Sequence, residues 1–122
     1  MSYKRVLIID DETDFCLLIK SYFVKKNYEV FVSHTLRDGM DCLEKIKPDI
    51  LLLDNNLPDG LGWEKTDYIS EHYPQVSINL ISAFQYNPDM YKQNASIKIW
   101  EKPISIAELN QYLNWMAIMA LF

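Results

Sequence analysis

The 122-residue sequence contains only three glycines, five prolines and two cysteines. So little glycine and proline excludes a collagen-like or low-complexity chain. Two cysteines cannot form a metal site by themselves, and both Cys16 and Cys42 lie among apolar residues in a helical pattern. We therefore expect both to be buried free thiols that act as small apolar side chains.

The sequence also lacks an apolar run long enough to span a membrane. Its longest nearly uncharged apolar run, residues 115–122, has eight residues, whereas a spanning helix needs about 20. Near the N-terminus, the apolar run ends at Asp10-Asp11 after four residues, which is too short for a secretory signal. These absences predict a cytoplasmic protein without a membrane partner.

Positive charge is scarce as well. Lys and Arg number 12 against 17 Asp and Glu, the net charge is −5, and no basic cluster is longer than Lys25-Lys26. Such a chain has no electrostatic footprint for nucleic acid, so we expect no direct nucleic-acid partner. The 49% of apolar residues can fill a core, and the length suits one domain, which we assign to residues 1–122.

Short apolar runs rich in β-branched residues recur along the chain, and their first residues are 21 to 27 positions apart. That spacing accommodates one helix and two short loops between successive runs. The first and third runs are continuously apolar between their charged ends, as expected of strands that are covered on both faces and hence parallel. The predicted strands are 5–10, 28–33, 49–54, 76–82 and 97–100.

The stretches between these runs have the periodicity of helices with one buried face. Two apolar stripes carry this pattern: Phe15, Leu18, Ile19, Tyr22 and Phe23, and then Leu36, Met40, Leu43 and Ile46. Weaker patterns predict a helix at 62–72 and a short one at 88–93, and Ser105 with Glu108 forms a capping box that opens a fifth helix. The alternation predicts an α/β fold with a doubly wound, five-stranded parallel sheet.

Polar residues follow several of these strands at their carboxyl ends, which share one edge of a parallel sheet. Asp10-Asp11 follows the first strand, Asp54 ends the third, Ser82 ends the fourth, and Lys102-Pro103 follows the fifth. Three carboxylates in one crevice repel one another and require a proton or a cation at neutral pH. Oxygen ligands of this kind suit Mg²⁺ or Mn²⁺.

These residues resemble the motifs of the receiver domain of two-component response regulators, and the match covers essentially the whole chain. The resemblance implies a CheY-like (βα)5 domain with the flavodoxin-like strand order 2-1-3-4-5. It also implies a signalling domain that catalyses only its own phosphorylation and dephosphorylation. The motif residues are Asp10-Asp11, Asp54 with the following Asn55-Asn56-Leu57-Pro58-Asp59-Gly60, Ser82-Ala83, and Lys102-Pro103.

The resemblance also implies a role for each site residue. Asp54 would accept the phosphoryl group from a sensor histidine kinase or phosphotransfer protein. Asp11, Asp54 and the backbone carbonyl of Asn56 would bind Mg²⁺ or Mn²⁺, with Asp10 acting largely through water on the metal. Lys102 would pair with Asp54 and with the phosphoryl oxygens, before a cis peptide at Pro103, and the Ser82 hydroxyl would hydrogen-bond a phosphoryl oxygen.

Two features depart from the usual receiver pattern. Ile99 occupies the position, three residues before Lys102, at which receivers usually carry Tyr or Phe, and Trp100 follows it on the opposite face of the strand. Either Trp100 replaces the aromatic switch or that step is absent. The last predicted helix is apolar on nearly every side, which favours a homodimer through helix 4, strand 5 and helix 5. The alternative is a chain cut short before a further domain.

Three other functions remain open on the sequence alone. A pseudo-receiver would be a protein-binding module that no longer depends on phosphorylation, and Ile99 favours it. A phosphohydrolase resembling the haloacid dehalogenases would need an acid two residues after Asp54, where this chain has Asn56, which cannot transfer protons. A flavodoxin-like electron carrier is disfavoured because the first loop is acidic and cannot cradle a phosphate.

Overall fold

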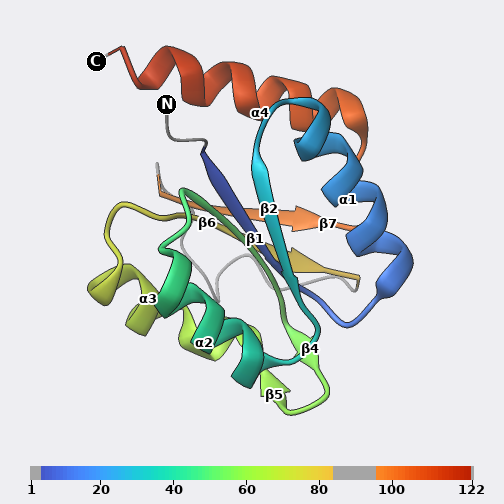
Figure 1. Ribbon diagram of the computed structural model, residues 1–122, viewed down its shortest axis with the longest axis vertical. Helices are drawn as coiled ribbons and strands as arrows, with labels where there is room; N and C mark the ends of the chain where they lie inside the picture. The colour runs from blue at the N-terminus through green and yellow to red at the C-terminus, as the bar shows by residue number, and fades with distance from the viewer. Residues whose placement is uncertain (1–3, 84–95, 122) are drawn as a thin grey trace.

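The computed structural model describes residues 4–83 and 96–121, and a five-stranded parallel sheet forms its centre (Figure 1). The strand order is β2-β1-β3-β6-β7, which confirms the predicted order 2-1-3-4-5 when these strands are counted along the chain. All neighbouring strands are parallel. The strands are β1 (Arg5–Ile9), β2 (Glu29–Ser33), β3 (Ile50–Asp54), β6 (Ser77–Ser82) and β7 (Ile97–Glu101).

Helices cover both faces of this sheet. Helices α1 and α4 lie on one face, and α2 and α3 lie on the other (Figure 1). The predicted helix at 88–93 lies outside the described residues, so α4 corresponds to the predicted fifth helix. Among the helices that the structure describes, none is long and apolar enough to cross a membrane. The helices are α1 (Thr13–Lys25), α2 (Leu36–Ile46), the 3₁₀ helix η1 (Gly62–Lys65), α3 (Thr66–His72) and α4 (Ile106–Met119).

The sheet separates two hydrophobic cores, because successive side chains of a strand point to opposite faces. In β1, Val6 and Ile8 pack in the core beneath α1 and α4, whereas Leu7 and Ile9 pack in the core beneath α2 and α3. All four side chains are fully buried. Burial on both faces is therefore the physical reason for the uninterrupted apolar sequence of this strand.

The helix starts agree with the sequence signals, but some predicted burial was wrong. Ser105 and Glu108 form the predicted capping box at the start of α4. On α1, Leu18 was expected in the buried stripe but is 55% exposed, and Cys16 lies in the core in its place. Cys42 was expected to be buried and is only half-buried, because it lies at the border of the buried face of α2.

A short hairpin follows β3 and was missed by the sequence analysis. Its two-residue strands are β4 (Asn56–Leu57) and β5 (Gly60–Leu61). The hairpin returns the chain so closely to β3 that a Cβ atom on Gly62 would overlap the backbone carbonyl oxygen of Asp54. Glycine is therefore required at position 62, and the hairpin is packed directly against the end of the central strand.

Ile99 and Trp100 point to opposite faces of β7, as their alternation predicts, and both are buried. The indole Nε1 of Trp100 donates to the side-chain oxygen of Asn79, at 2.8 Å. The amide of Asn79 donates in turn to the hydroxyl of Tyr112 on α4, at 3.0 Å. A buried polar network thus joins β6, β7 and α4 and holds the Trp100 ring in the core.

Replacement of Asn79 by Leu should destabilise the protein, because the buried indole N–H of Trp100 then has no acceptor. A buried unpaired donor costs about 1–3 kcal/mol. In a Trp100→Phe background, Asn79→Leu should cost clearly less, since the donor is already gone. Urea unfolding of the four proteins in this double-mutant cycle measures the difference, and equal costs in both backgrounds would show that the hydrogen bond contributes nothing.

Candidate functional site

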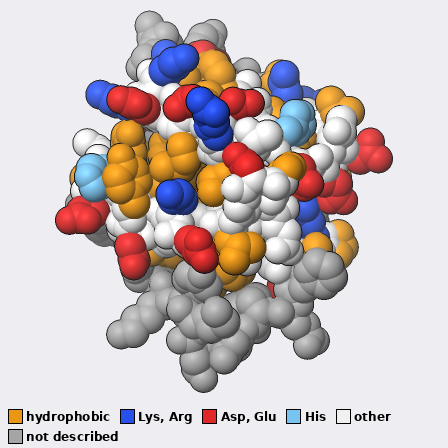
Figure 2. Space-filling view, turned by 90° about the horizontal axis from the view of Figure 1, so that it is seen from below, with side chains coloured by type: hydrophobic (Ala, Val, Ile, Leu, Met, Phe, Trp, Pro, Cys, Tyr) orange, Lys and Arg blue, Asp and Glu red, His pale blue; other side chains and the backbone are white. Residues whose placement is uncertain are grey.

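The polar residues at the strand ends meet in a pocket of about 390 Å³ at the carboxyl edge of the sheet. Side-chain oxygens of Asp10, Asp11 and Asp54 all lie within 4.8 Å of one another. On the lower face of the molecule, acidic and basic side chains are interspersed (Figure 2). The pocket is lined by Asp11, Glu12, Asp54, Asn56, Ala83 and Lys102.

Asp10 lies at the floor of this arrangement and is fully buried. One carboxylate oxygen accepts from the backbone N–H of Glu12 at 2.8 Å, and the other pairs with Lys102 Nζ at 2.8 Å. A buried charge without partners would be very costly. These two contacts therefore keep the carboxylate of Asp10 in place immediately behind the pocket.

The ammonium group of Lys102 is held by Asp10 and Glu12. Its Nζ lies 3.1 Å from Glu12 Oε2 and 4.4 Å from the centre of the Phe15 ring. In the described part of the chain, Asp54 does not form an ion pair with this lysine. Burial lowers the pKa of Lys102, but hydrogen bonds and charges from Asp10 and Glu12 outweigh burial and raise the pKa above its ordinary value.

Asp54 is the last residue of β3 and its side chain is almost completely buried. Burial, and next the negative charge of Asp10, raise the pKa of this carboxyl from 3.8 to about 6, against the opposing charge of Lys102. The same acidic surroundings act on the thiol of Cys16, whose pKa burial raises to about 12. Among the described residues, the carboxylates around the pocket thus outnumber the one ammonium group that lines it, that of Lys102.

The other two predicted site residues lie at the same edge of the sheet. Ser82 ends β6 and is buried, and its backbone carbonyl accepts from the backbone N–H of Lys102 at 2.8 Å. Asn56 is exposed in β4 and lines the pocket. The peptide bond between Lys102 and Pro103 is cis, as the resemblance implied.

Sequence reasoning missed Glu12 and Phe15 as parts of this site. Glu12 follows the acidic pair directly and is the N-cap of α1, and Phe15 lies in the first turn of that helix. The sequence signal that could have identified these two residues was their position shortly after the acidic pair at the end of a strand. Without coordinates, however, a polar residue at a helix start is equally well explained as a cap, and Phe15 as a core residue.

The donor set fits a small divalent cation. Three carboxylates, those of Asp11, Glu12 and Asp54, line the pocket, and that of Asp10 lies behind it. The ammonium group of Lys102 pairs with Asp10 and Glu12. Hard oxygen ligands and room for several waters are the conditions under which Mg²⁺ or Mn²⁺ binds. Asp11 and Asp54 are the two carboxylates that both line the pocket and belong to the close triad.

Comparison with known proteins adds an independent finding. The family model of the response regulator receiver domain matches residues 6–114. Chemotaxis protein CheY of Thermotoga maritima is 32% identical over 81 residues, which are 66% of this chain and 68% of CheY. A CheY-like receiver domain protein from Methanospirillum hungatei has a TM-score of 0.84 at 24% identity over 94% of both chains, a likeness that shows the fold.

Some relatives are much longer than this chain and are similar to it over only part of their length. Response regulator protein PilR of Pseudomonas aeruginosa is 29% identical over 84 residues, which are 69% of this chain and 19% of PilR. The chain therefore spans about a fifth of the length of PilR. The activity of PilR as a whole is therefore not transferred to this chain.

Asp54→Asn should stabilise the protein near neutral pH when no divalent cation is present. The folded protein binds the Asp54 proton more tightly than the unfolded chain does, so stability falls as pH rises from 3.8 to about 6. The neutral amide avoids this loss, which we set at about 1–2 kcal/mol because water in the pocket screens the charges. Below about pH 4 the two proteins should differ little.

Chemical unfolding of both proteins across this pH range measures the effect. Asp67→Asn, at an exposed position in α3, is the control for loss of one negative charge. A pH-independent difference between wild type and Asp54→Asn would contradict the assignment of the raised pKa to Asp54.

Proposed function

We propose that this chain, which belongs to the response regulator receiver domain family, accepts a phosphoryl group on Asp54. This phosphorylation would switch a protein-interaction face. The donor would be a sensor histidine kinase or a phosphotransfer protein. The observation that carries this proposal is the placement of Asp54, buried at the end of β3 within 4.8 Å of two further carboxylates and facing an open pocket.

In the proposed reaction, an ionised carboxylate oxygen of Asp54 attacks the phosphorus atom of a phosphohistidine. A new P–O bond forms as the P–N bond breaks, and the electron pair leaves with the imidazole nitrogen. Bound Mg²⁺ or Mn²⁺, held by Asp11, Asp54 and the backbone carbonyl of Asn56, would neutralise charge on the transferring group. Positioning and charge neutralisation supply most of the catalysis in such transfers.

Lys102 and Ser82 would respond to the new phosphoryl group. In the described structure the ammonium group lies on Asp10 and Glu12, so it must turn from Glu12 toward Asp54 to contact phosphoryl oxygens. Ser82 ends the neighbouring strand and is joined to Lys102 through the backbone hydrogen bond of 2.8 Å. A movement of either residue would therefore be transmitted to the ends of β6 and β7.

A pseudo-receiver is the second candidate, because one observation favours it. The apolar Ile99 is buried where receivers usually carry a movable ring, and Trp100 is fixed by Asn79 on the other face of β7. These contacts favour the alternative in which the usual aromatic step is absent over the one in which Trp100 replaces it. A protein that signals by binding alone would need neither Ile99 nor Trp100 to move.

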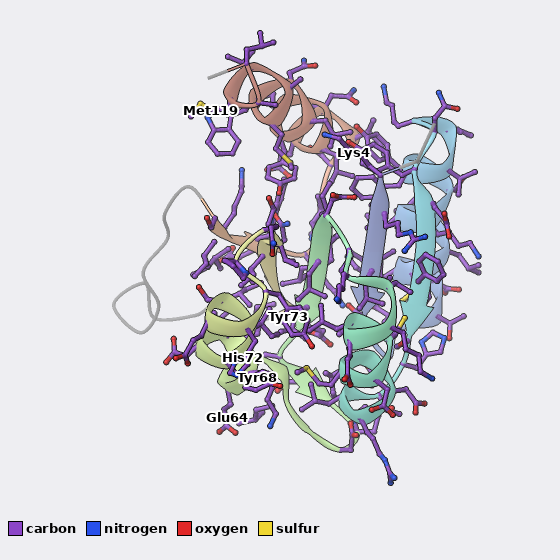
Figure 3. The ribbon with its side chains drawn as sticks, turned by 60° about the vertical axis from the view of Figure 1, so that its left-hand side comes forward. Lys4, Glu64, Tyr68, His72, Tyr73 and Met119 are labelled. Carbon is purple, nitrogen blue, oxygen red and sulfur yellow. The ribbon has the colours of Figure 1, made fainter. Side chains whose placement is uncertain are left out.

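Helix α4 supplies the proposed output face. Its exposed apolar side chains favour the proposed homodimer through this helix and β7, although the predicted helix at 88–93 lies outside the described residues. Met119 lies at the far end of α4, well away from the labelled side chains of α3 (Figure 3). The exposed apolar residues of this end of the chain are Ile106, Trp115, Ile118, Met119 and Leu121.

Intact mass spectrometry after incubation with acetyl phosphate tests the proposed function. With Mg²⁺ present, the wild type should gain the mass of one phosphoryl group, and Asp54→Asn should gain none because the attacking oxygen is lost. Asp67→Asn should behave as the wild type. No labelling of wild type by this donor or by a phosphorylated kinase would favour the pseudo-receiver, and labelling of Asp54→Asn at an unchanged rate would refute the assignment of Asp54.

Glu12→Gln should accelerate the labelling of Asp54, because Lys102 then loses one of its two carboxylate partners and turns more readily. A partly exposed ion pair contributes about 0.5–1 kcal/mol, which corresponds to roughly a threefold faster rate. Asp14→Asn, which removes a negative charge in the first turn of α1, is the matched control. Equal acceleration by both variants would mean that only overall charge matters.

A further inference from the structure

Asp59 joins the hairpin after β3 to a helix that lies 23 residues earlier in the sequence. One carboxylate oxygen of Asp59 accepts from the backbone N–H of Leu36 at 2.7 Å, and the other accepts from the N–H of Arg37 at 2.9 Å. Both donors lie in the first turn of α2, where backbone N–H groups have no partner within the helix. The tip of the hairpin is therefore anchored to the start of α2.

The base of the same hairpin is held by separate contacts. The backbone oxygen of Asn55 accepts from Gly62 N–H at 2.9 Å, and its side-chain oxygen accepts from Trp63 N–H at 3.1 Å. The indole Nε1 of Trp63 donates to the backbone oxygen of Leu53 at 3.2 Å. The hairpin is thus fixed to β3 at its base and to α2 at its tip, and Asn56 lies between these two anchors.

We propose that Asp59 is a positioning residue that holds the backbone carbonyl of Asn56 at the metal pocket by anchoring the hairpin tip to α2. This inference rests on the proposed function, in which that carbonyl is a ligand of Mg²⁺ or Mn²⁺. Asn56 lines the pocket but is itself exposed. Its position therefore depends on the burial of the adjacent Leu57 and on the two anchors of the hairpin.

The helix that anchors the hairpin tip is connected to the loop that contacts the acidic pair. Helix α2 begins directly after the loop that contains His34, whose Nδ1 lies 2.9 Å from the backbone oxygen of Asp10. Because a carbonyl oxygen only accepts, Nδ1 carries the proton in this contact. One loop thus contacts the backbone of Asp10 and leads into the helix that Asp59 caps. The acidic pair and the hairpin, on the two sides of the pocket, are therefore both held by the segment of the loop and α2.

A merely structural role for Asp59 would be that of a helix cap, and α2 offers the matched control for it. Thr35 is the N-cap of α2, and its hydroxyl oxygen accepts from the N–H of Asp38 at 3.1 Å. Thr35 and Asp59 therefore cap the same helix, but only Asp59 comes from the hairpin. The amides of Arg37 and Leu36 lower the pKa of Asp59, so the carboxylate accepts both hydrogen bonds at neutral pH.

The test is a titration of the whole chain with Mn²⁺, in which electron paramagnetic resonance measures the free ion. Asp59→Ala should bind Mn²⁺ about tenfold more weakly than wild type, as loss of groups that orient metal ligands commonly does. Thr35→Ala should bind within about twofold of wild type, although both variants lose a cap of typical strength. Asp59→Asn retains one acceptor oxygen and should be intermediate, and it carries the test if Asp59→Ala does not fold.

The outcomes separate the inference from the proposed function. Weaker binding by the Asp59 variants alone, at thermal stabilities matched to Thr35→Ala, supports the positioning role. Equal affinities in Asp59→Ala and Thr35→Ala overturn it, because a general loss of helix capping would then explain everything. Failure of the wild type to bind Mn²⁺, or unchanged binding in Asp11→Asn, would overturn the metal site itself and with it the role of Asp59.

Discussion

The buried ion pair between Asp10 and Lys102 is the interaction on which the site depends. Asp10 is fully buried, and its carboxylate pairs with the ammonium group of Lys102 through one oxygen and accepts the N–H of Glu12 through the other. Breaking a buried ion pair by removing one partner is strongly destabilising. This pair fixes the floor of the pocket and also draws Lys102 away from Asp54. Burial first, and then the negative charge of Asp10, raise the pKa of Asp54 against the opposing charge of Lys102.

Two kinds of contact build the remainder of the pocket. Charged contacts hold Lys102 on one side, where it can exchange partners, since Glu12 is exposed and an exposed ion pair is weak. Backbone contacts hold the hairpin on the other side, where Gly62 packs directly on the carbonyl of Asp54. The arrangement thus combines a cation with one weak, exposed partner and a loop fixed by backbone contacts. The proposed phosphoryl transfer would use both.

The proposed output face depends on a different kind of contact from the site. Trp100 is buried and hydrogen-bonded to Asn79, and Asn79 continues to Tyr112 on α4. Polar groups in a core are stable only with their partners, so β6, β7 and α4 are joined in one arrangement. In the proposed function, a signal from Ser82 and Lys102 to α4 would therefore pass through this coupled unit.

The sequence by itself determined the α/β class, the five strands and the residues at their carboxyl ends, because periodicity and strand-end polarity are local properties of the chain. Apolar runs such as Val6 to Ile9, repeated at helix-sized intervals, favour strands of a sheet covered on both faces. Only the tertiary structure decided that Lys102 lies on Glu12, that Leu18 faces solvent, and that Asp59 caps α2. Each of these depends on contacts between segments far apart in the sequence, and no local pattern encodes which partner a charged or polar side chain will meet.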